Sequence, residues 1–269
     1  MLINGIRTVH NTPDFQRANA SVGKNLSRLS SGKWLSSAAD DTAAMAIAEK
    51  LEAELKSHAQ AERNISYGTD LTSTADAALG HQCEILSRMR ELAVQGANGT
   101  LDTKAREAIN NEFNSLREEF DRVAATTEYN GQSLLQGGDL DIQAGIDADP
   151  TSQVDLALPD TQVTSLGLGA VDLTTQAGSM DGLSSLDTAI TDLGADRAEL
   201  GATANRLGFA ESVNDVITQN KASSASGIGD TDYAEEASAL HLNRFRAQVA
   251  LKARSIESEA RGGLLNLIA

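Results

Sequence analysis

Apolar residues recur every seven positions from residue 43 to residue 98, and this repeat restricts the fold more than any other feature. A sustained heptad repeat predicts one long helix that packs along a seam against partner helices. Such a helix would measure ~80 Å, whereas a compact globule of this chain would be about 50 Å across. We therefore predict an elongated bundle. The first seam position holds Ala44, Leu51, Ile65, Leu79, Leu86 and Ala93, and the second holds Ile47, Ala61, Ala75 and Met89.

Several residues interrupt this seam. Glycine weakens a helix interior, and kinks commonly form where the regular packing is lost. We therefore expect a bend or a local break in the long helix, with Gly68 as the first candidate. The interrupting residues are Glu54, His58, Gly68, Thr72, Gln82 and Gly96.

The composition supports a helical bundle and excludes some partners. The chain has one Trp, three Tyr and five Phe, so its core must consist of Leu, Ile, Val and Ala, which suit closely packed helices.

The net charge of −16 argues against nucleic acid, whose phosphates would be repelled. A basic cluster near the C-terminus lacks a groove-reading motif, and we interpret it as a helix face. The cluster consists of Arg244, Arg246, Lys252, Arg254 and Arg261.

The sequence carries no recognisable site for chemistry. The four histidines are scattered without a catalytic signature, so we predict that the chain is not an enzyme and binds no cofactor. Cys83 is the single cysteine, which excludes an internal disulfide and a cysteine-based metal site. No apolar run reaches the ~20 residues needed to cross a membrane. The first ten residues lack the apolar stretch of a secretory signal, so composition alone would indicate the cytoplasm.

Shorter helices flank the long one. Thr12 and Pro13 form a helix start, and the helix they open is expected to end near Gly32. Residues 36–41 are expected to connect it to the long helix. Asp102 or Thr103 is expected to cap a further helix with a regular apolar stripe. This stripe consists of Ala105, Ile109, Phe113, Leu116, Phe120 and Val123.

The second half of the chain begins with strands and returns to helix. Alternating apolar residues on both sides of a turn-rich segment predict a β-hairpin over about 133–160, followed by a loop to 182. Helix is expected from Leu183 to about Ala222, because leucines recur seven apart there. We expect the serine- and glycine-rich residues 223–229 to break it. Asp232 and Glu235 then form a capping box for the last helix.

The predicted fold is mainly α, an elongated antiparallel coiled-coil bundle with a small β-hairpin cap. Its parts are an N-terminal helix (1–35), a connector (36–42), a helical bundle (43–222), a second connector (223–231) and a C-terminal helix (232–269). The two end helices are too short to bury a core of their own. We expect them to be largely disordered in an isolated subunit and to become ordered when copies assemble.

Several motifs resemble those of bacterial flagellins, the subunits of the flagellar filament. The N-terminal motifs are SRLSSG at 27–32, SAADD at 37–41, AIA at 46–48, QAERN at 60–64, RMRELAVQ at 88–95, NGT at 98–100 and YNG at 129–131. The C-terminal motif is DTDYAEE at 230–236. The resemblance covers about 1–160 and 183–269. The interval between these parts is short, whereas many flagellins insert a large outer domain there.

This resemblance implies an extracellular helical homopolymer that serves swimming motility. The end helices would form an inner tube and the 43–222 bundle an outer one. Export would proceed through the flagellar type III channel without a cleaved signal, and a cap, junction proteins and an export chaperone would be partners. We predict that the end helices self-assemble through Phe15, Val22, Leu26, Leu29, Leu242, Phe245, Val249, Ile256, Leu264 and Leu267.

Family members also present a patch to the animal innate-immune flagellin receptor. Arg90, Leu92, Val94 and Glu112 occupy the matching positions, and we expect subunit packing to be their main role. One alternative function is a hook–filament junction protein, which shares the N-terminal pattern. Another, of a different class, is a soluble coiled-coil adaptor or receptor-binding ligand.

Overall fold

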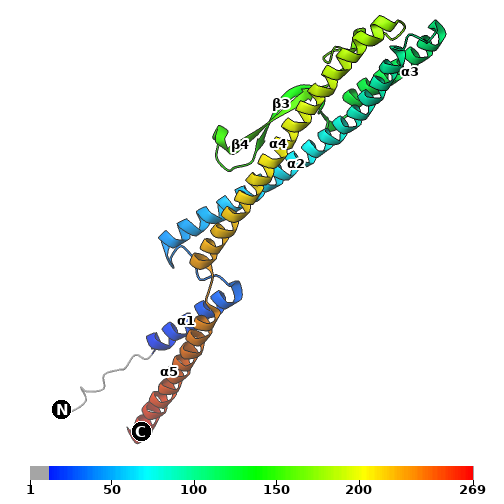
Figure 1. The fold of residues 1–269 in the computed structure, drawn as a ribbon. Coiled ribbons are helices and arrows are strands. Elements are labelled where there is room, and N and C mark those ends of the chain that lie inside the picture. Colours follow the sequence, from blue (N-terminus) through cyan, green and yellow to red (C-terminus); the bar gives the residue numbers. More distant parts are fainter. Residues whose placement is uncertain (1–11, 269) are drawn as a thin grey trace. The chain divides into compact units, whose positions relative to one another are not determined.

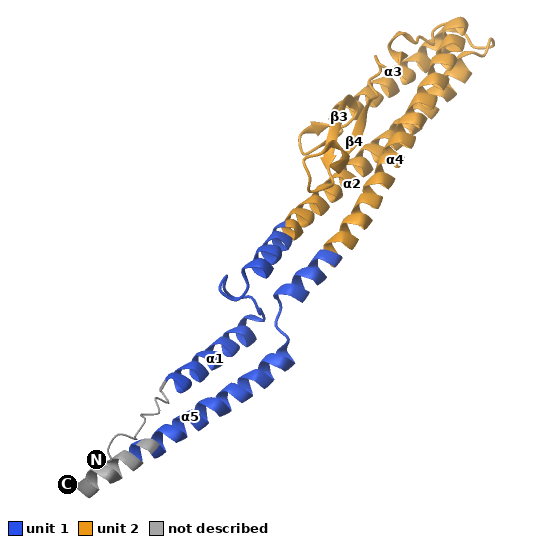
Figure 2. Ribbon diagram, turned by 90° about the vertical axis from the view of Figure 1, so that its left-hand side faces the viewer, with its two compact units in different colours: residues 1–53, 220–269 blue, residues 54–219 orange. Residues whose placement is uncertain are grey.

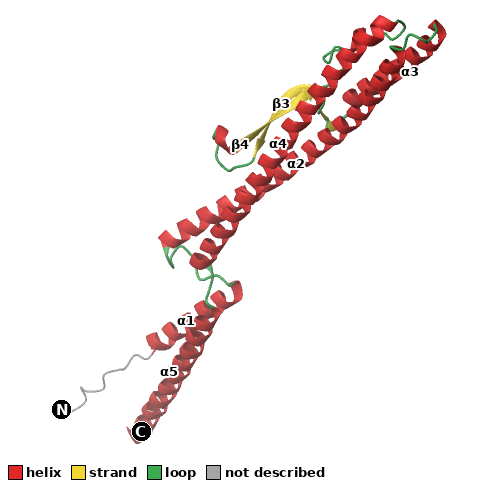
Figure 3. Ribbon diagram, in the orientation of Figure 1, coloured by secondary structure: helices red, strands yellow, loops and turns green. Residues whose placement is uncertain are grey.

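The computed structural model describes residues 12–268, of which residues 12, 257 and 260–268 are described by their backbone alone. The chain divides into two units, one of residues 1–53 with 220–269 (unit 1) and one of residues 54–219 (unit 2) (Figure 2). The predicted class is confirmed, because the fold is mainly helical with small antiparallel hairpins (Figures 1 and 3). The long helices are α1 (Thr12–Ser31), α2 (Thr42–Gly96), α3 (Thr103–Thr126), α4 (Gln176–Gly229) and α5 (Tyr233–Ile268).

The long helix α2 runs for 55 residues without the break expected at Gly68. That expectation was wrong because the glycine serves close packing. A Cβ atom on Gly68 would lie 2.6 Å from Ile142 Cδ1 and 3.3 Å from Leu207 Cδ1. The missing side chain therefore lets β3 and α4 approach α2.

Most of the polar residues that interrupt the α2 seam are buried in unit 2 rather than exposed at a weak point. His58, Thr72 and Gln82 all lie in the interior. Thr72 Oγ1 donates to Gly68 O at 2.7 Å, and Gln82 Nε2 donates to Phe120 O at 3.3 Å. Because a buried polar group is costly unless it is hydrogen-bonded, these contacts let polar side chains occupy the seam.

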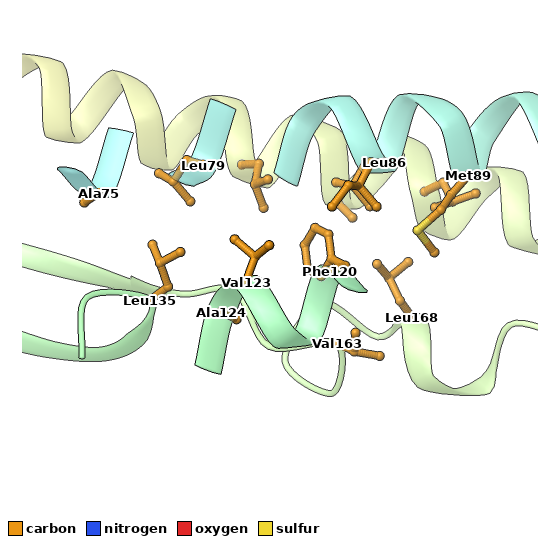
Figure 4. Packing of buried hydrophobic residues seen from close by; sticks show 14 of the residues in the cluster. Ala75, Leu79, Leu86, Met89, Phe120, Val123, Ala124, Leu135, Val163 and Leu168 are labelled. Carbon is orange, nitrogen blue, oxygen red and sulfur yellow. The ribbon is translucent and has the colours of Figure 1, made fainter. Parts of the chain in front are cut away.

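The core of unit 2 lies where α2, α3 and α4 meet the segment between α3 and α4. Figure 4 shows Leu86 and Met89 of α2 facing Phe120 of α3 and Leu168 of that segment. Leu168 belongs to the short 3₁₀ helix η2 (Leu168–Ala170). The predicted stripe of α3 faces this core, with Phe113 and Phe120 fully buried and Ile109 and Val123 nearly so.

The turn between α2 and α3 is fixed by two side chains. Asp102 caps α3 as expected, and its carboxylate accepts a hydrogen bond from Ala105 N at 2.8 Å. The buried Arg106 donates to Gly96 O and to Asn98 O, the latter at 2.8 Å. These donors satisfy carbonyls that the end of α2 leaves without a helical partner.

Two hairpins follow α3. The expected one consists of β3 (Gln136–Gln143) and β4 (Gln153–Asp160), with Leu140 opposite Leu156, and it is joined by a loop containing η1 (Pro150–Ser152). A smaller hairpin of β1 (Glu128–Tyr129) and β2 (Gln132–Ser133) was not predicted. Asn130 and Gly131 both have positive φ there, which is the geometry of a two-residue hairpin turn.

The bounds of α4 differ from the expected ones at both ends. It begins at Gln176 rather than near Leu183, and it continues to Gly229 rather than ending near Ala222. The serine- and glycine-rich residues 223–229 are therefore helical, where a connector was expected. Ser224 Oγ donates to Asn220 O at 2.8 Å, so serine hydroxyls in this stretch bond back to the helix.

Unit 1 contains α1 and α5 side by side (Figures 1 and 2). Gly32, with φ +70°, ends α1 as predicted, and Asp232 caps α5 by accepting from Ala234 N at 2.8 Å. The segments beyond these helix ends join each other: Trp34 N donates to Gly229 O and Thr231 N donates to Gly32 O, both at 2.8 Å. Both end helices are formed here, and their expected disorder in an isolated subunit stays a prediction.

Candidate functional site

The apolar stripe predicted for α5 lies uncovered. Leu242, Phe245, Val249 and Ile256 have exposed fractions between 49% and 62%. Their spacing of three, four and seven residues places them on one side of the helix, whereas the buried Leu240 lies on another. Leu264 and Leu267 of the predicted set lie outside the described side chains.

The stripe predicted for α1 is partly covered. Phe15, Val22 and Leu29 are half-buried, and Leu26 is 52% exposed. The short helix α1 therefore uses most of this stripe within unit 1. Leu26 is the member that a further molecule could cover most fully.

A charged cluster lies beside α1 in unit 1. The Asp40 side chain is 6% exposed, and its Oδ1 lies 2.5 Å from Lys24 Nζ and 3.7 Å from Arg28 Nη2. The hydrogen bond from Lys24, assisted by Ser36, lowers the pKa of Asp40 to about 2 against the burial that would raise it. The Arg28 guanidinium also lies 5.2 Å from the centroid of the Trp34 ring.

The second predicted patch lies in unit 2, and the structure separates its members. Leu92 is 1% exposed and belongs to the core, whereas Val94 is half exposed. Arg90 Nε donates to Asp187 Oδ1 of α4 at 2.6 Å, and this bond lowers the pKa of Asp187.

Glu112, the remaining member, makes a different ion pair. Its Oε1 accepts from Arg88 Nη2 at 2.6 Å, which joins α3 to α2. Arg88 and Asp187 are the partners that the sequence motif did not indicate. The exposed part of the patch thus consists of two ion pairs and Val94.

An uncovered apolar face on α4 was not predicted from the sequence. Phe209 is 73% exposed, and Val213 and Val216 are also exposed. They follow one another at four- and three-residue steps, on the side of α4 away from the buried Leu207. A groove of about 330 Å³ lies beside this face, lined by Phe209, Val213 and residues of the β3–β4 hairpin. The spacing of Phe209, Val213 and Val216 can be read from the sequence, but the leucine seam of the same helix is the stronger pattern.

The described residues give little sign of a chemical site. Between residues 12 and 268, no group of three or more His, Cys, Asp or Glu side chains could hold a metal ion. No helix in that range combines the length and apolarity of a membrane span. Burial raises the pKa of the Cys83 thiol, which makes this thiol a weaker nucleophile.

Helical units that leave apolar helix faces uncovered are typical of proteins that associate through their helices. Residues 6–139 match the bacterial flagellin N-terminal helical region, and residues 183–268 match the bacterial flagellin C-terminal helical region. The chain belongs to the bacterial flagellin family.

Individual proteins agree with this assignment. The chain is 34% identical over 245 residues to a flagellin of Halalkalibacterium halodurans, with 88% of each chain covered. It is 32% identical over 270 residues to a flagellin of Listeria innocua, with 94% of each covered. A crystal structure of Bacillus cereus flagellin is 34% identical and superposes with a TM-score of 0.50 over 56% of this chain and 88% of that one. The chain is thus a structural subunit of the flagellar filament, and these relatives favour neither the junction protein nor the adaptor.

Proposed function

We propose that copies of this chain polymerise through the outward faces of α1 and α5, which form the inner tube of the filament. The observation that carries this proposal is the uncovered α5 stripe of Leu242, Phe245, Val249 and Ile256. Burying one such side chain fully contributes about 1.5–3 kcal/mol. The stripe recurs in every subunit. Neighbouring copies therefore cover the side of α5 that α1 leaves exposed.

The proposal is tested by seeded polymerisation of the full chain. Phe245→Asp places a charge in the stripe and is expected to raise the critical concentration for elongation at least tenfold, or to abolish growth. Ser258→Asp adds the same charge at an exposed position of α5 outside the stripe, and it should elongate like the wild type. Normal filaments from Phe245→Asp, seen by negative-stain microscopy, would refute the α5 contact.

The outward α4 face is a second packing surface in this proposal. Phe209, Val213 and Val216 form an uncharged strip on a chain whose net charge is −16. Copies with that charge repel each other, so the least unfavourable approach is through uncharged faces. A neighbouring copy is therefore the proposed occupant of this face.

Export through the flagellar type III channel, binding by an export chaperone, and contacts with cap and junction proteins belong to the same proposal. Family membership supports them. Secretion that stops when the flagellar export apparatus is deleted would support this route, and unchanged secretion would refute it.

The exposed residues Arg90, Val94 and Glu112 are proposed to pack subunit against subunit, with recognition by the animal flagellin receptor as a second role. Exposure of Val94 supports access to both partners. Lost polymerisation of Arg90→Ala would support packing. Unchanged polymerisation with weakened receptor signalling would favour recognition as the main role.

A further inference from the structure

Residues from the two ends of the chain meet in one buried polar cluster between α1 and α5. Asn25 and Glu236 are each 7% exposed. Asn25 Nδ2 donates to Glu236 Oε1, and Asn25 Oδ1 accepts from Asn243 Nδ2 at 2.9 Å. The Asn25 amide thus uses both of its ends on two α5 residues that lie two turns apart.

The charge of Glu236 is compensated from α1. Arg28 Nη1 lies 3.8 Å from Glu236 Oε2, while Nη2 of the same guanidinium faces Asp40. Lys24 supplies a second cation to Asp40. Each buried carboxylate of the cluster therefore has a cation within 3.8 Å in this alignment of the helices.

The apolar part of the same interface is small. Among the described side chains of α1 and α5, Leu240 is the single buried apolar one. On α1 the half-buried apolar residues include Phe15, Val22 and Leu29, whereas on α5 they are alanines, among them Ala237 and Ala247. The alanine seam of α5 looks similar after a shift of one helical turn, so it constrains the alignment of the two helices only weakly.

We propose that Asn25, Glu236 and Asn243 form a register lock, in which these positioning residues set the alignment of α1 against α5. A shift by one turn would bring Ser21 or Leu29 to the place of Asn25, so the paired amide contacts to Glu236 and Asn243 would be lost. Buried polar groups that fix helix register at some expense of stability are well attested in coiled coils. Since register decides which α1 side chains lie level with the α5 stripe, the lock also sets the composition of the proposed assembly surface. That last step rests on the proposed function, whereas the lock itself does not.

The experiment measures register in the monomer, in an osmolyte such as sucrose that favours the ordered state of the end helices. Spin labels are attached to cysteines placed at the exposed Gln16 and Gln248, in the full chain with Cys83→Ser. With the native cluster, pulsed electron-electron resonance should give a single narrow distance distribution. The triple variant Asn25→Leu, Glu236→Leu, Asn243→Leu should broaden or split it, while helix content and thermal midpoint stay equal or rise.

Two control variants separate register from ordinary stability. Asn19→Leu with Glu235→Leu makes comparable exchanges at exposed positions and should leave the distribution narrow. Glu236→Gln keeps an acceptor for Asn25 and should also preserve it. An unchanged narrow distance distribution in the triple variant would overturn the lock. If the thermal midpoint also fell, the cluster would have a purely structural role. Because the readout is monomeric, it holds or fails independently of filament assembly.

Discussion

His58 Nδ1 lies 2.6 Å from Asn214 Oδ1, and Asn214 Nδ2 donates to His58 O at 3.2 Å, so the two residues pair reciprocally across α2 and α4. With Asn214 Oδ1 as acceptor, the proton of the imidazole resides on Nδ1. Both side chains are buried in unit 2. The pair therefore holds the two long helices together at a point where the apolar seam is interrupted.

His58→Ala should destabilise the protein by about 1–3 kcal/mol, because it leaves Oδ1 of the buried Asn214 without its donor. Urea unfolding followed by circular dichroism measures the effect. The matched control is His81→Ala at an exposed position of α2, which should stay within about 0.5 kcal/mol of the wild type. Replacing both members of the pair by leucine should recover part of the loss. Equal midpoints for His58→Ala and His81→Ala would show that the pair does not contribute.

Two glycines of α2 should respond in opposite directions to alanine. Gly68→Ala places a Cβ against Ile142 and Leu207 and should destabilise by about 1–3 kcal/mol, as overpacking does. Gly80 has nothing within 4 Å of its Cβ position, so Gly80→Ala should stabilise by up to about 1 kcal/mol through helix propensity. The urea unfolding midpoints of the two variants, compared with that of the wild type, measure both effects. Adding Ile142→Val to Gly68→Ala should restore part of the midpoint, and stabilisation by both alanines would contradict the packing role of Gly68.

Acid should weaken unit 1 through Asp40. The pKa of Asp40 is about 2 in the folded state and 3.8 ordinarily, so its contribution to stability is full above about pH 4 and disappears as the pH falls through 2. Fluorescence of Trp34, the single tryptophan, reports on the adjacent Arg28. Asp40→Asn should flatten the fluorescence change between pH 4 and 2, whereas Asp14→Asn should not. Identical curves for the wild type and Asp40→Asn would exclude this carboxylate as the source.

Periodicity predicted the helices well because a seam of leucines and alanines depends on local spacing. It could not predict which polar residues tolerate burial, since the partners of His58 and Gln82 come from other helices. The continuation of α4 to Gly229 was missed because serine and glycine favour breaks in isolation, whereas the structure keeps them helical. The β1–β2 hairpin was missed even though Asn130-Gly131 is a strong turn signal.

The candidate surfaces were predictable to different degrees. The α5 stripe follows from spacing alone, and its described members lie exposed in the structure. A linear motif, however, places Arg90, Leu92 and Val94 together, although alternate residues of a helix point in different directions. Leu92 consequently lies in the core. Burial against other elements separates such residues, and a single sequence does not contain that information.

The α4 face gives the last prediction. Phe209→Asp adds a charge to the uncharged strip without touching the buried seam, so circular dichroism and the urea midpoint should stay close to those of the wild type. Elongation from wild-type seeds should require at least a tenfold higher monomer concentration, about 1.4 kcal/mol of lost association energy. Ala222→Asp, exposed on another side of the same helix, should elongate normally. Because the wild type must elongate in the same assay, equal critical concentrations for all three chains would reject this face alone and leave the α5 contact standing.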